Sequence, residues 1–414
     1  MRVEAAAVDA AYERLHGVVA RTPLQPHERA SAATGARVWL KREDLQVVRS
    51  YKLRGAYNLL AQLDDDQRDR TVVCASAGNH AQGVAFACRA LDLRAQIFLP
   101  RTTPRQKRAR IALLGGDRVE TIVGGDTYDA AFAAATEQAE RTGALMVPAF
   151  DHPDIIAGQG TVAREIVEQL GHAPDVVLVP VGGGGLVAGM TAWLAKHHPS
   201  TRVIGVEPAG AASMAAAVAA GRPVELAELD GFVDGAAVRK VGTHTYGVLE
   251  EHPVELREVD PGVLCEEMLD LFDVDGVIAE PAGALAPAAL RTGGVVAPGE
   301  TVVAVVSGGN HDVSRYAEVM ERALVSRGVK HYFLVEFPQE PGALRRFLDE
   351  VLGPDDDITL FEYVKRTNRE FGPALVGIEL GSPADLAPLL ARLAASPISA
   401  QKLAPSDPVF RFLV

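Results

Sequence analysis

The sequence predicts an α/β protein with mostly parallel sheets, followed by a small α+β domain of the ferredoxin-like type. Short Val/Ile-rich runs alternate with helical segments from Arg37 to about Gly309, which is typical of parallel sheets. Hydrophobic residues make up 48% of the chain and aromatic residues only 6%, which suits buried parallel strands. Near Ser326 the pattern changes. We therefore expect a first region at residues 1–325 and a separate domain at residues 326–414.

The elements of the first region follow from these apolar runs. The expected strands are residues 38–40, 71–75, 96–99, 119–123, 176–181, 203–206 and 301–306, and long helices are expected at residues 128–139 and 155–170. The first residues read as an amphipathic helix. They lack the basic start and the apolar block of a signal peptide. Residues 176–195 carry no charge, but Pro180 and four glycines divide them into a strand and a helix, so we expect no membrane span.

The second region follows the order β-α-β-β-α-β of the ferredoxin-like unit. Its expected strands are residues 331–337, 358–364, 374–380 and 408–414, and its expected helices begin at Pro341 and Ala384. This order predicts an antiparallel sheet with two helices.

Composition excludes several classes of partner. The formal net charge is −13, from 41 basic and 54 acidic residues, so the surface repels nucleic acid and anionic membranes. The three cysteines, Cys74, Cys88 and Cys265, show no CxxC spacing. They indicate neither a disulfide framework nor a zinc site, and they fit a reducing cytoplasm.

One lysine has an unusual position for a solvated side chain. Lys52 stands at the start of a predicted helix, two residues before Arg54, just after the charged end of a strand. Ligands of open α/β sheets bind where the chain leaves a strand. A lysine there can form a Schiff base with a carbonyl cofactor if its surroundings lower the pKa of its amine. An ordinary surface lysine is the alternative reading of the residue alone.

Three glycine-rich turns each follow an apolar strand. They are Ser76-Ala77-Gly78-Asn79-His80, Gly182-Gly183-Gly184-Gly185-Leu186 and Ser307-Gly308-Gly309-Asn310. We expect all three to leave the carboxyl ends of strands in one sheet system and to converge on one ligand. The four glycines would let backbone N–H groups approach a phosphate at a helix start. A tight crossover with positive φ is the structural alternative for this turn.

A rival function uses the same loop. Gly183 and Gly185, with Ala188, fit a relaxed dinucleotide fingerprint, and Glu207 ends the next strand at the spacing of a ribose-binding acid. Read alone, this pattern favours an NAD-dependent dehydrogenase. It leaves Lys52, Asn79 and Ser307 without a purpose, whereas a cofactor with one phosphate and an aldehyde employs them all.

Seven motifs together resemble pyridoxal-phosphate enzymes of the tryptophan-synthase-β fold (fold type II), and within them the threonine dehydratases (threonine deaminases). The motifs are residues 50–56 (SYKLRGA), 76–83 (SAGNHAQG), 150–153 (FDHP), 158–161 (GQGT), 182–186 (GGGGL), 280–284 (EPAGA) and 307–310 (SGGN). The resemblance covers nearly the whole chain in order. It implies two open twisted α/β domains, with a small subdomain at about residues 50–150 inserted in the larger one.

The resemblance also implies residue roles. Lys52 would hold pyridoxal 5′-phosphate, Asn79 would bond the ring 3′-oxygen, and Ser307 would face the ring nitrogen. The backbone of Gly182, Gly183, Gly184, Gly185 and Leu186 would bind the phosphate, and the turn of Ser76, Ala77, Gly78, Asn79 and His80 would bind the substrate carboxylate. The expected reaction converts L-threonine to 2-oxobutanoate and ammonia, with the freed Lys52 amine taking the Cα proton. A neutral Ser307 makes the ring a weaker electron sink and favours elimination.

Two positions narrow the activity. Related serine racemases carry a serine as second base where this chain has Ala77, so we expect dehydration rather than racemisation. Glu207 stands where those racemases place a metal ligand. Its neighbours offer no second carboxylate, so we expect no metal and place Glu207 in solvent at the strand end. An L-serine dehydratase or a serine-racemase-like enzyme remains the alternative.

The last region resembles the ACT-like regulatory domain of short biosynthetic threonine dehydratases. Pro341-Gly342-Ala343-Leu344 matches the ligand loop of such domains. The resemblance implies inhibition by isoleucine, the end product of the pathway, and a homotetramer in the cytoplasm. An oligomerisation module without a ligand and a non-enzymatic amino-acid sensor are the alternatives. L-threonine is the expected substrate and L-serine a secondary one, because one methyl group discriminates weakly.

Overall fold

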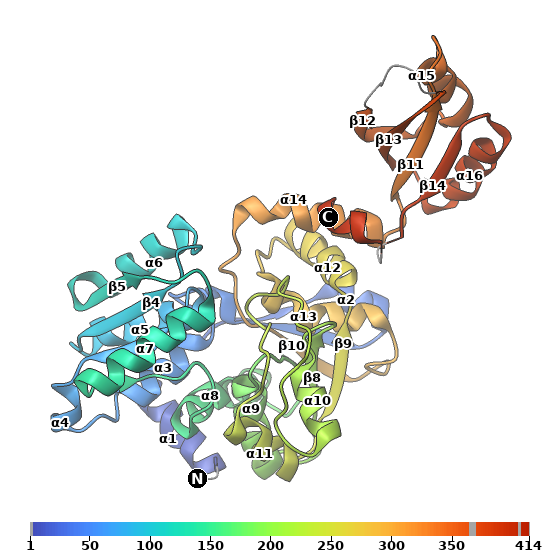
Figure 1. The fold of residues 1–414 in the computed structure, drawn as a ribbon. Coiled ribbons are helices and arrows are strands. Elements are labelled where there is room, and N and C mark those ends of the chain that lie inside the picture. Colours follow the sequence, from blue (N-terminus) through green and yellow to red (C-terminus); the bar gives the residue numbers. More distant parts are fainter. Residues whose placement is uncertain (1–2, 364–369, 405–406, 414) are drawn as a thin grey trace. The chain divides into compact units, whose positions relative to one another are not determined.

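The structure is a computed structural model that describes residues 3–363, 370–404 and 407–413. The chain forms two compact units, Met1–Asp312 and Val313–Val414 (Figure 1). Helix α14 (Tyr316–Ser326) belongs to the second unit, although nearly all of its residues fall within the first region that we expected, residues 1–325.

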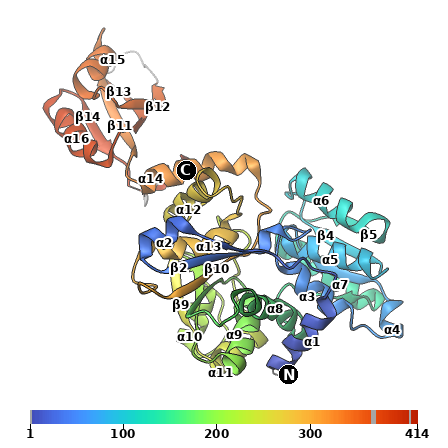
Figure 2. The same cartoon turned by 180° about the vertical axis from the view of Figure 1, so that it is seen from behind.

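The larger sheet of the first unit has the strand order β1-β2-β10-β7-β8-β9. Its strands are β1 (Leu24–Pro26), β2 (Arg37–Arg42), β7 (Val176–Pro180), β8 (Arg202–Pro208), β9 (Glu255–Val259) and β10 (Thr301–Val306). All pairs are parallel except β1 with β2, and Figure 2 shows β2 and β10 side by side although they are far apart in sequence. The parallel sheet expected from the apolar runs is confirmed.

Helices cover both faces of this sheet. Val177 and Val179 pack in one core with α1 (Ala5–Leu15), α8 (Pro153–Leu170) and α9 (Gly185–His197). Helix α13 (Pro281–Ala289) contacts β7, β8 and β10 outside that core, on the other face, and α12 (Pro261–Asp273) packs on α13. The remaining helices of the larger part are α2 (Glu28–Thr34), α10 (Ser213–Ala220) and α11 (Thr243–Glu251).

A second, smaller parallel sheet has the order β5-β4-β3-β6. Its strands are β3 (Val72–Ala75), β4 (Ala95–Leu99), β5 (Val119–Val123) and β6 (Leu145–Met146), and its helices are α3 (Lys52–Leu60), α4 (Asp65–Arg68), α5 (Asn79–Ala90), α6 (Arg105–Gly115) and α7 (Tyr128–Thr142). Strand residues alternate between two cores: Cys74 packs with α3 and α5, and Val73 packs with α7. These strands all fall within the segment that we expected as an inserted subdomain.

Three described strands of the first unit were not predicted. β1 has three residues and ends in a proline, β6 has two, and β9 is the charged edge segment Glu-Leu-Arg-Glu-Val. Edge and very short strands lack the buried apolar run that identifies a central strand. The uncharged segment 176–195 divides, as expected, into β7 and the first part of α9.

The second unit is built on an antiparallel sheet in the order β12-β13-β11-β14. The strands are β11 (Lys330–Pro338), β12 (Asp357–Tyr363), β13 (Phe371–Glu379) and β14 (Ser399–Lys402), and the helices are α15 (Ala343–Arg346), which a π-helical turn extends to Val351, and α16 (Leu386–Ala395). The β-α-β-β-α-β order is confirmed. Phe333 and Val335 of β11 pack with Phe347 and Leu389 in one core.

The expected last strand was wrong. Pro408–Phe412 form a 3₁₀ helix, and the fourth strand is β14, which pairs antiparallel with β11. Pro408 lacks the N–H that a ladder requires, whereas the polar run Ser-Ala-Gln-Lys of β14 gives no apolar signal. Residue 414 lies outside the described part of the chain.

No helix in the described part of the chain is both long enough and apolar enough to cross a membrane. The three cysteines are buried and unpaired with one another.

Candidate active site

Lys52 is the first residue of α3, and its amine lies in a desolvated position. Its Nζ donates to the backbone oxygen of Ala149 at 2.9 Å and lies 5.4 Å from the centre of the Tyr51 ring. Burial lowers the pKa of Lys52 to about 8, against the opposing charge of Glu280. Far more of this amine is neutral near pH 7 than of a surface lysine, so Lys52 is suited to nucleophilic and base chemistry.

The turn after β10 lies beside the start of α3. The Tyr51 N–H donates to the Ser307 carbonyl at 3.2 Å, and Ser50 forms a bridge with Gly308. The Ser307 hydroxyl is buried, and within the described part of the chain its one hydrogen bond is a long one, 3.3 Å, to the Ala282 oxygen. It can therefore turn to a ligand at small cost.

The turn after β3 meets the turn after β10. The side-chain nitrogen of Asn310 donates to Asn79 Oδ1 at 2.6 Å, and the Asn79 nitrogen donates to Glu280. Our expectation that all three turns leave one sheet was wrong, because β3 belongs to the smaller sheet and β7 and β10 to the larger. The turns of the two sheets nevertheless meet, so the site is built across both.

The four glycines begin helix α9, and both readings of this turn have support. Gly184 has φ +91°, and a Cβ at Gly183 would lie 2.3 Å from the Phe150 ring, so backbone conformation and packing both require glycine. Within the described part of the chain, the N–H groups from Gly182 to Leu186 donate to no acceptor. Successive free N–H groups at a helix start form a site for an anion such as a phosphate.

A short segment joins Lys52 to this glycine loop. The Ala149 oxygen accepts from Lys52, and the adjacent Phe150 ring packs on Gly183. Asp151 then accepts the N–H groups of residues 243–245 at the start of α11. Sequence reasoning assigned the motif at residues 150–153 no role in the site, because the contact to Lys52 is made by a backbone carbonyl, which no residue type signals.

The turn from Ser76 to His80 offers a second set of donors. The Gly78 N–H donates to the Ser76 hydroxyl, whereas those of Ala77, Asn79 and His80 have no acceptor among the described residues. The buried His80 ring bonds the Val147 oxygen at 3.0 Å, and burial and the Lys52 charge lower its pKa to about 4. The imidazole ring is therefore neutral, and His80 contributes only its backbone N–H to this set of free donors. A carboxylate fits this set of donors.

Glu280 is a site residue to which sequence reasoning gave no role. Its carboxyl is buried against Asn79, and burial and Asp234 raise its pKa to about 7 although the Asn79 hydrogen bond lowers it. The next residue is a proline at the first position of α13, so the sequence pattern at Glu280 indicates only the start of a helix.

Glu207 is not in solvent, which corrects our expectation. It is fully buried, and its carboxylate accepts the Met214 and Ala215 N–H groups at 2.7 and 2.9 Å where α10 begins. Burial raises its pKa to about 7 against these two hydrogen bonds. Helix α10 covers the end of β8, so this acid is occupied and cannot bind a ribose. That geometry removes the dehydrogenase reading of the loop.

One group of described residues has the spacing of a metal site: His27, Glu267 and Asp275. The Arg29 guanidinium donates to both of the carboxylates in this group, at 2.7–3.1 Å. A cation would have to displace that buried ion pair. We interpret this group as structural and assign it no part in the site.

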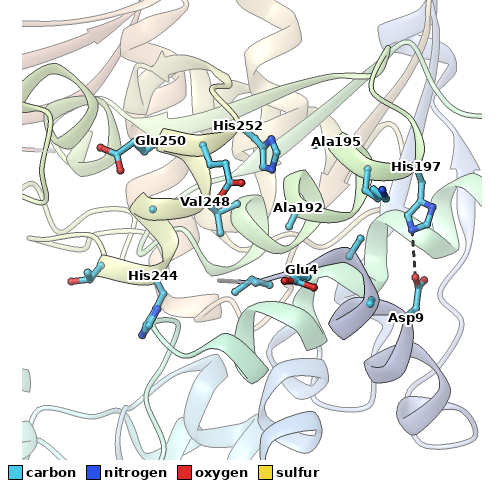
Figure 3. Close-up of a pocket in the computed structure, with 16 residues that line it drawn as sticks. Glu4, Asp9, Ala192, Ala195, His197, His244, Val248, Glu250 and His252 are labelled. Atoms are coloured by element: carbon cyan, nitrogen blue, oxygen red, sulfur yellow. Dashed lines mark ion pairs between the residues drawn. The ribbon is translucent and has the colours of Figure 1, made fainter. Parts of the chain in front are cut away.

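A surface cleft of about 890 Å³ lies elsewhere, among α1, α9 and α11 (Figure 3). His197 and Asp9 form an ion pair across one side of it at 3.4 Å, and His244, Glu250 and His252 line another part. None of the predicted site residues lines this cleft, so it is separate from the site around Lys52.

Comparison with known proteins agrees with this geometry. Residues 15–308 match the family described as pyridoxal-phosphate dependent enzyme, and residues 321–413 match the C-terminal regulatory domain of threonine dehydratase. The chain is 60% identical, over 98% of its length and 95% of the relative's, to the biosynthetic L-threonine dehydratase IlvA of Mycobacterium tuberculosis.

Two solved structures resemble the catalytic part. Processed threonine deaminase isoform 2 from Solanum lycopersicum has a TM-score of 0.73 and 37% identity, covering 78% of this chain and 96% of that one. Maize serine racemase has a TM-score of 0.72 and 29% identity, covering 78% and 99%.

The fold and the site define a pyridoxal-phosphate-dependent lyase. The chain belongs to the pyridoxal-phosphate dependent enzymes and carries a threonine-dehydratase regulatory domain. Pyridoxal phosphate fits the residues present, because the site offers a desolvated amine, free N–H groups for a phosphate and a free amide hydrogen on Asn79. The dehydrogenase and the non-enzymatic sensor are thereby excluded.

Proposed function

We propose that this protein converts L-threonine to 2-oxobutanoate and ammonia, the first step of isoleucine biosynthesis, with L-serine as a secondary substrate. The observation that carries the proposal is the Lys52 amine, with a pKa of about 8, between two sets of free backbone donors. The relatives named as L-threonine dehydratases support the substrate, because their identity extends over nearly the whole chain.

In this proposal each group has one task. Pyridoxal phosphate, held by Lys52, supplies the electron sink that stabilises negative charge at the substrate Cα. The N–H groups from Gly182 to Leu186 would hold its phosphate, the free side-chain N–H of Asn79 would donate to its 3′-oxygen, and Ser307 would face its ring nitrogen. These contacts orient the reacting carbon before the proton moves.

The substrate carboxylate would be held by the free N–H groups of Ala77, Asn79 and His80, on the turn that begins at Ser76 and Gly78. Lys52 Nζ, when neutral, would take the Cα proton, and the β-hydroxyl would leave with a proton as water. The released enamine would then take up water and yield 2-oxobutanoate and ammonia. A burial-lowered pKa suits this step, since a base works best when its pKa lies near the working pH.

Ala77 favours elimination over racemisation. A racemase needs a second acid–base group opposite the lysine, and a methyl group cannot carry a proton. We expect the purified protein with bound cofactor to form 2-oxobutanoate from L-threonine and to form no D-serine from L-serine, measured by a keto-acid assay and chiral chromatography. The variant Ala77→Ser, which supplies a hydroxyl, is the matched comparison. D-serine production by the unchanged protein at a rate near that of pyruvate formation would contradict this assignment.

We also propose that isoleucine binds the second unit and inhibits the first. Gly342, at φ +89°, caps the start of α15 after the short turn that follows β11, and Leu344 in that helix is exposed, so the loop offers an apolar side chain. Inhibition requires isoleucine to bind two states of the enzyme unequally.

Removal of the residues from about Ser326 onward is expected to leave a threonine dehydratase that isoleucine no longer inhibits. The first unit has its own cores, and the tomato structure, which covers 78% of this chain, supports its independent folding. The measurement is the initial rate with increasing isoleucine for the full and shortened proteins. Equal inhibition of both would exclude the second unit as the regulatory site.

Assembly and location are part of the same proposal. The resemblance supports a homotetramer, which light scattering would test. The free buried cysteines are compatible with a reducing cytoplasm. The regulatory domain in this proposal comprises residues 326–414, and the catalytic region residues 1–325.

A further inference from the structure

Three polar side chains around the predicted cofactor contact form one chain of hydrogen bonds. Asn310 Nδ2 donates to the Val48 backbone oxygen at 2.8 Å and to Asn79 Oδ1 at 2.6 Å. Asn79 Nδ2 in turn donates to Glu280 Oε1. The chain thus runs from a backbone oxygen through two amides to a buried carboxyl.

A count of the donors in this chain leaves one side-chain N–H of Asn79 without an acceptor among the described residues. An asparagine side chain has two N–H donors and one oxygen. Asn310 uses both of its donors, and Asn79 uses its oxygen and one donor. Within the described part of the chain, the second N–H of Asn79 has no acceptor and remains available to a ligand.

The opposite orientation of the Asn79 amide is costly. Rotation by 180° would place its oxygen against the Glu280 carboxyl and its nitrogen against the Asn310 nitrogen. The two nitrogens would then set donor against donor whatever the protonation of Glu280, and the hydrogen bond to the Glu280 carboxylate would be lost as well in a buried place. Asn310 can present only donors to Asn79, because its position is set by the Val48 oxygen.

The backbone beside Glu280 makes room for this chain. A Cβ at Gly308 would lie 2.2 Å from Glu280 Oε1 and 3.2 Å from Asn79 Nδ2. Gly308 also accepts the Glu280 backbone N–H at 3.1 Å. The glycine therefore permits the carboxyl to reach Asn79.

We infer that Asn310 is a positioning residue: with Glu280, it fixes the orientation of the Asn79 amide so that one N–H stays directed to the cofactor ring oxygen. The inference rests on the proposed cofactor contact of Asn79. Asn310 itself touches neither cofactor nor substrate in this scheme.

The test compares Asn310→Asp, Asn79→Ala and the double variant. A carboxylate at position 310 accepts instead of donating, so the Asn79 amide should turn its nitrogen toward it. We expect Asn310→Asp to weaken the binding of pyridoxal 5′-phosphate to the apo-protein about tenfold, as loss of one hydrogen bond to a charged group implies. The readouts are the dissociation constant from absorbance titration and the pH midpoint of the bound cofactor's absorption band.

The double variant separates orientation from other effects. If Asn310 acts through Asn79, Asn310→Asp adds nothing once Asn79 is alanine. An equal loss in both backgrounds, or no loss in the first, would overturn the inference. If Asn79→Ala itself leaves cofactor affinity unchanged, the proposed contact of Asn79 fails and the inference fails with it.

Two further variants control for folding. Asn58→Asp makes the same change at a buried amide of α3, whose nitrogen donates to the Asp154 backbone oxygen at 2.7 Å and whose oxygen accepts from Arg14. This variant should leave cofactor affinity unchanged. If Asn310→Asp does not fold, Asn310→Ala is used, for which we expect a loss of severalfold, again only when Asn79 is present.

Discussion

Replacement of Lys52 by alanine is expected to lower the rate of threonine dehydration at least about a thousandfold, because in the proposed mechanism this one residue serves as both cofactor anchor and base. The amine is placed by the start of α3, by the Ala149 oxygen and by the desolvation that lowers its pKa to about 8. The amines of Lys41, Lys107 and Lys330 each donate to an acidic side chain, Glu165, Asp234 and Glu321, so none of them is free to replace Lys52.

The same experiment has a spectral readout. The unchanged protein should be yellow, and borohydride should bleach it and attach the cofactor to Lys52, which peptide mass spectrometry would locate. Lys52→Arg keeps the charge but cannot supply a neutral base, since arginine stays protonated, so it should be equally inactive. Lys240→Ala removes an exposed lysine as the control. Threonine turnover by Lys52→Ala at the unchanged rate would end the proposed mechanism.

Replacement of Arg54 by methionine is expected to lower the free energy of unfolding of the first unit by about 3–5 kcal/mol. Arg54 is fully buried and donates to Glu43 at 2.8 Å and to Glu165 at 2.7 Å, while Lys41 donates to Glu165 at 2.7 Å. Without the guanidinium, two buried carboxylates would share a single ammonium group. The measurement is the urea unfolding curve at pH 7.

This network also predicts a dependence on pH. Burial acts to raise the pKa of Glu43, but the charge and hydrogen bonds of Arg54 outweigh it and lower the pKa from 4.5 to about 2. The folded-state pKa is therefore below the unfolded value. The stabilisation from Glu43 is present above about pH 4.5 and is lost as the pH falls toward 2. Arg54→Met should remove this part of the acid dependence.

The control is a surface arginine. Arg21 pairs with Glu168 at 3.4 Å with much of its side chain exposed, and exposed pairs contribute less than about 1 kcal/mol. Arg21→Met should thus change stability little. If Arg54→Met and Arg21→Met had equal small effects, the buried network would not hold α3 in place.

Sequence reasoning was most accurate where burial sets the pattern. The apolar runs around Val179 and Val303 became central parallel strands because both faces of the sheet are covered. It failed where a short or charged segment lies at an edge, as in β9 and β14, because a half-exposed strand carries no continuous apolar signal.

The site shows the same division. Lys52 and the three turns were predicted from residue types whose chemistry is specific: an amine at a helix start, and glycines that expose N–H groups. The Ala149 oxygen, the buried Glu207 carboxylate and the amide of Asn310 were not, since their roles depend on what lies against them.

The sequence by itself determined the α/β class and the regulatory domain, and it predicts the groups that carry the chemistry. Periodicity and residue type are local properties, so they can be read along the chain. Only the tertiary structure decided that turns from two different sheets meet at Lys52, and that Asn79 keeps one hydrogen for a ligand. Those facts arise from contacts between residues far apart in sequence, and desolvation, which lowers the pKa of the lysine, exists only once those contacts have formed.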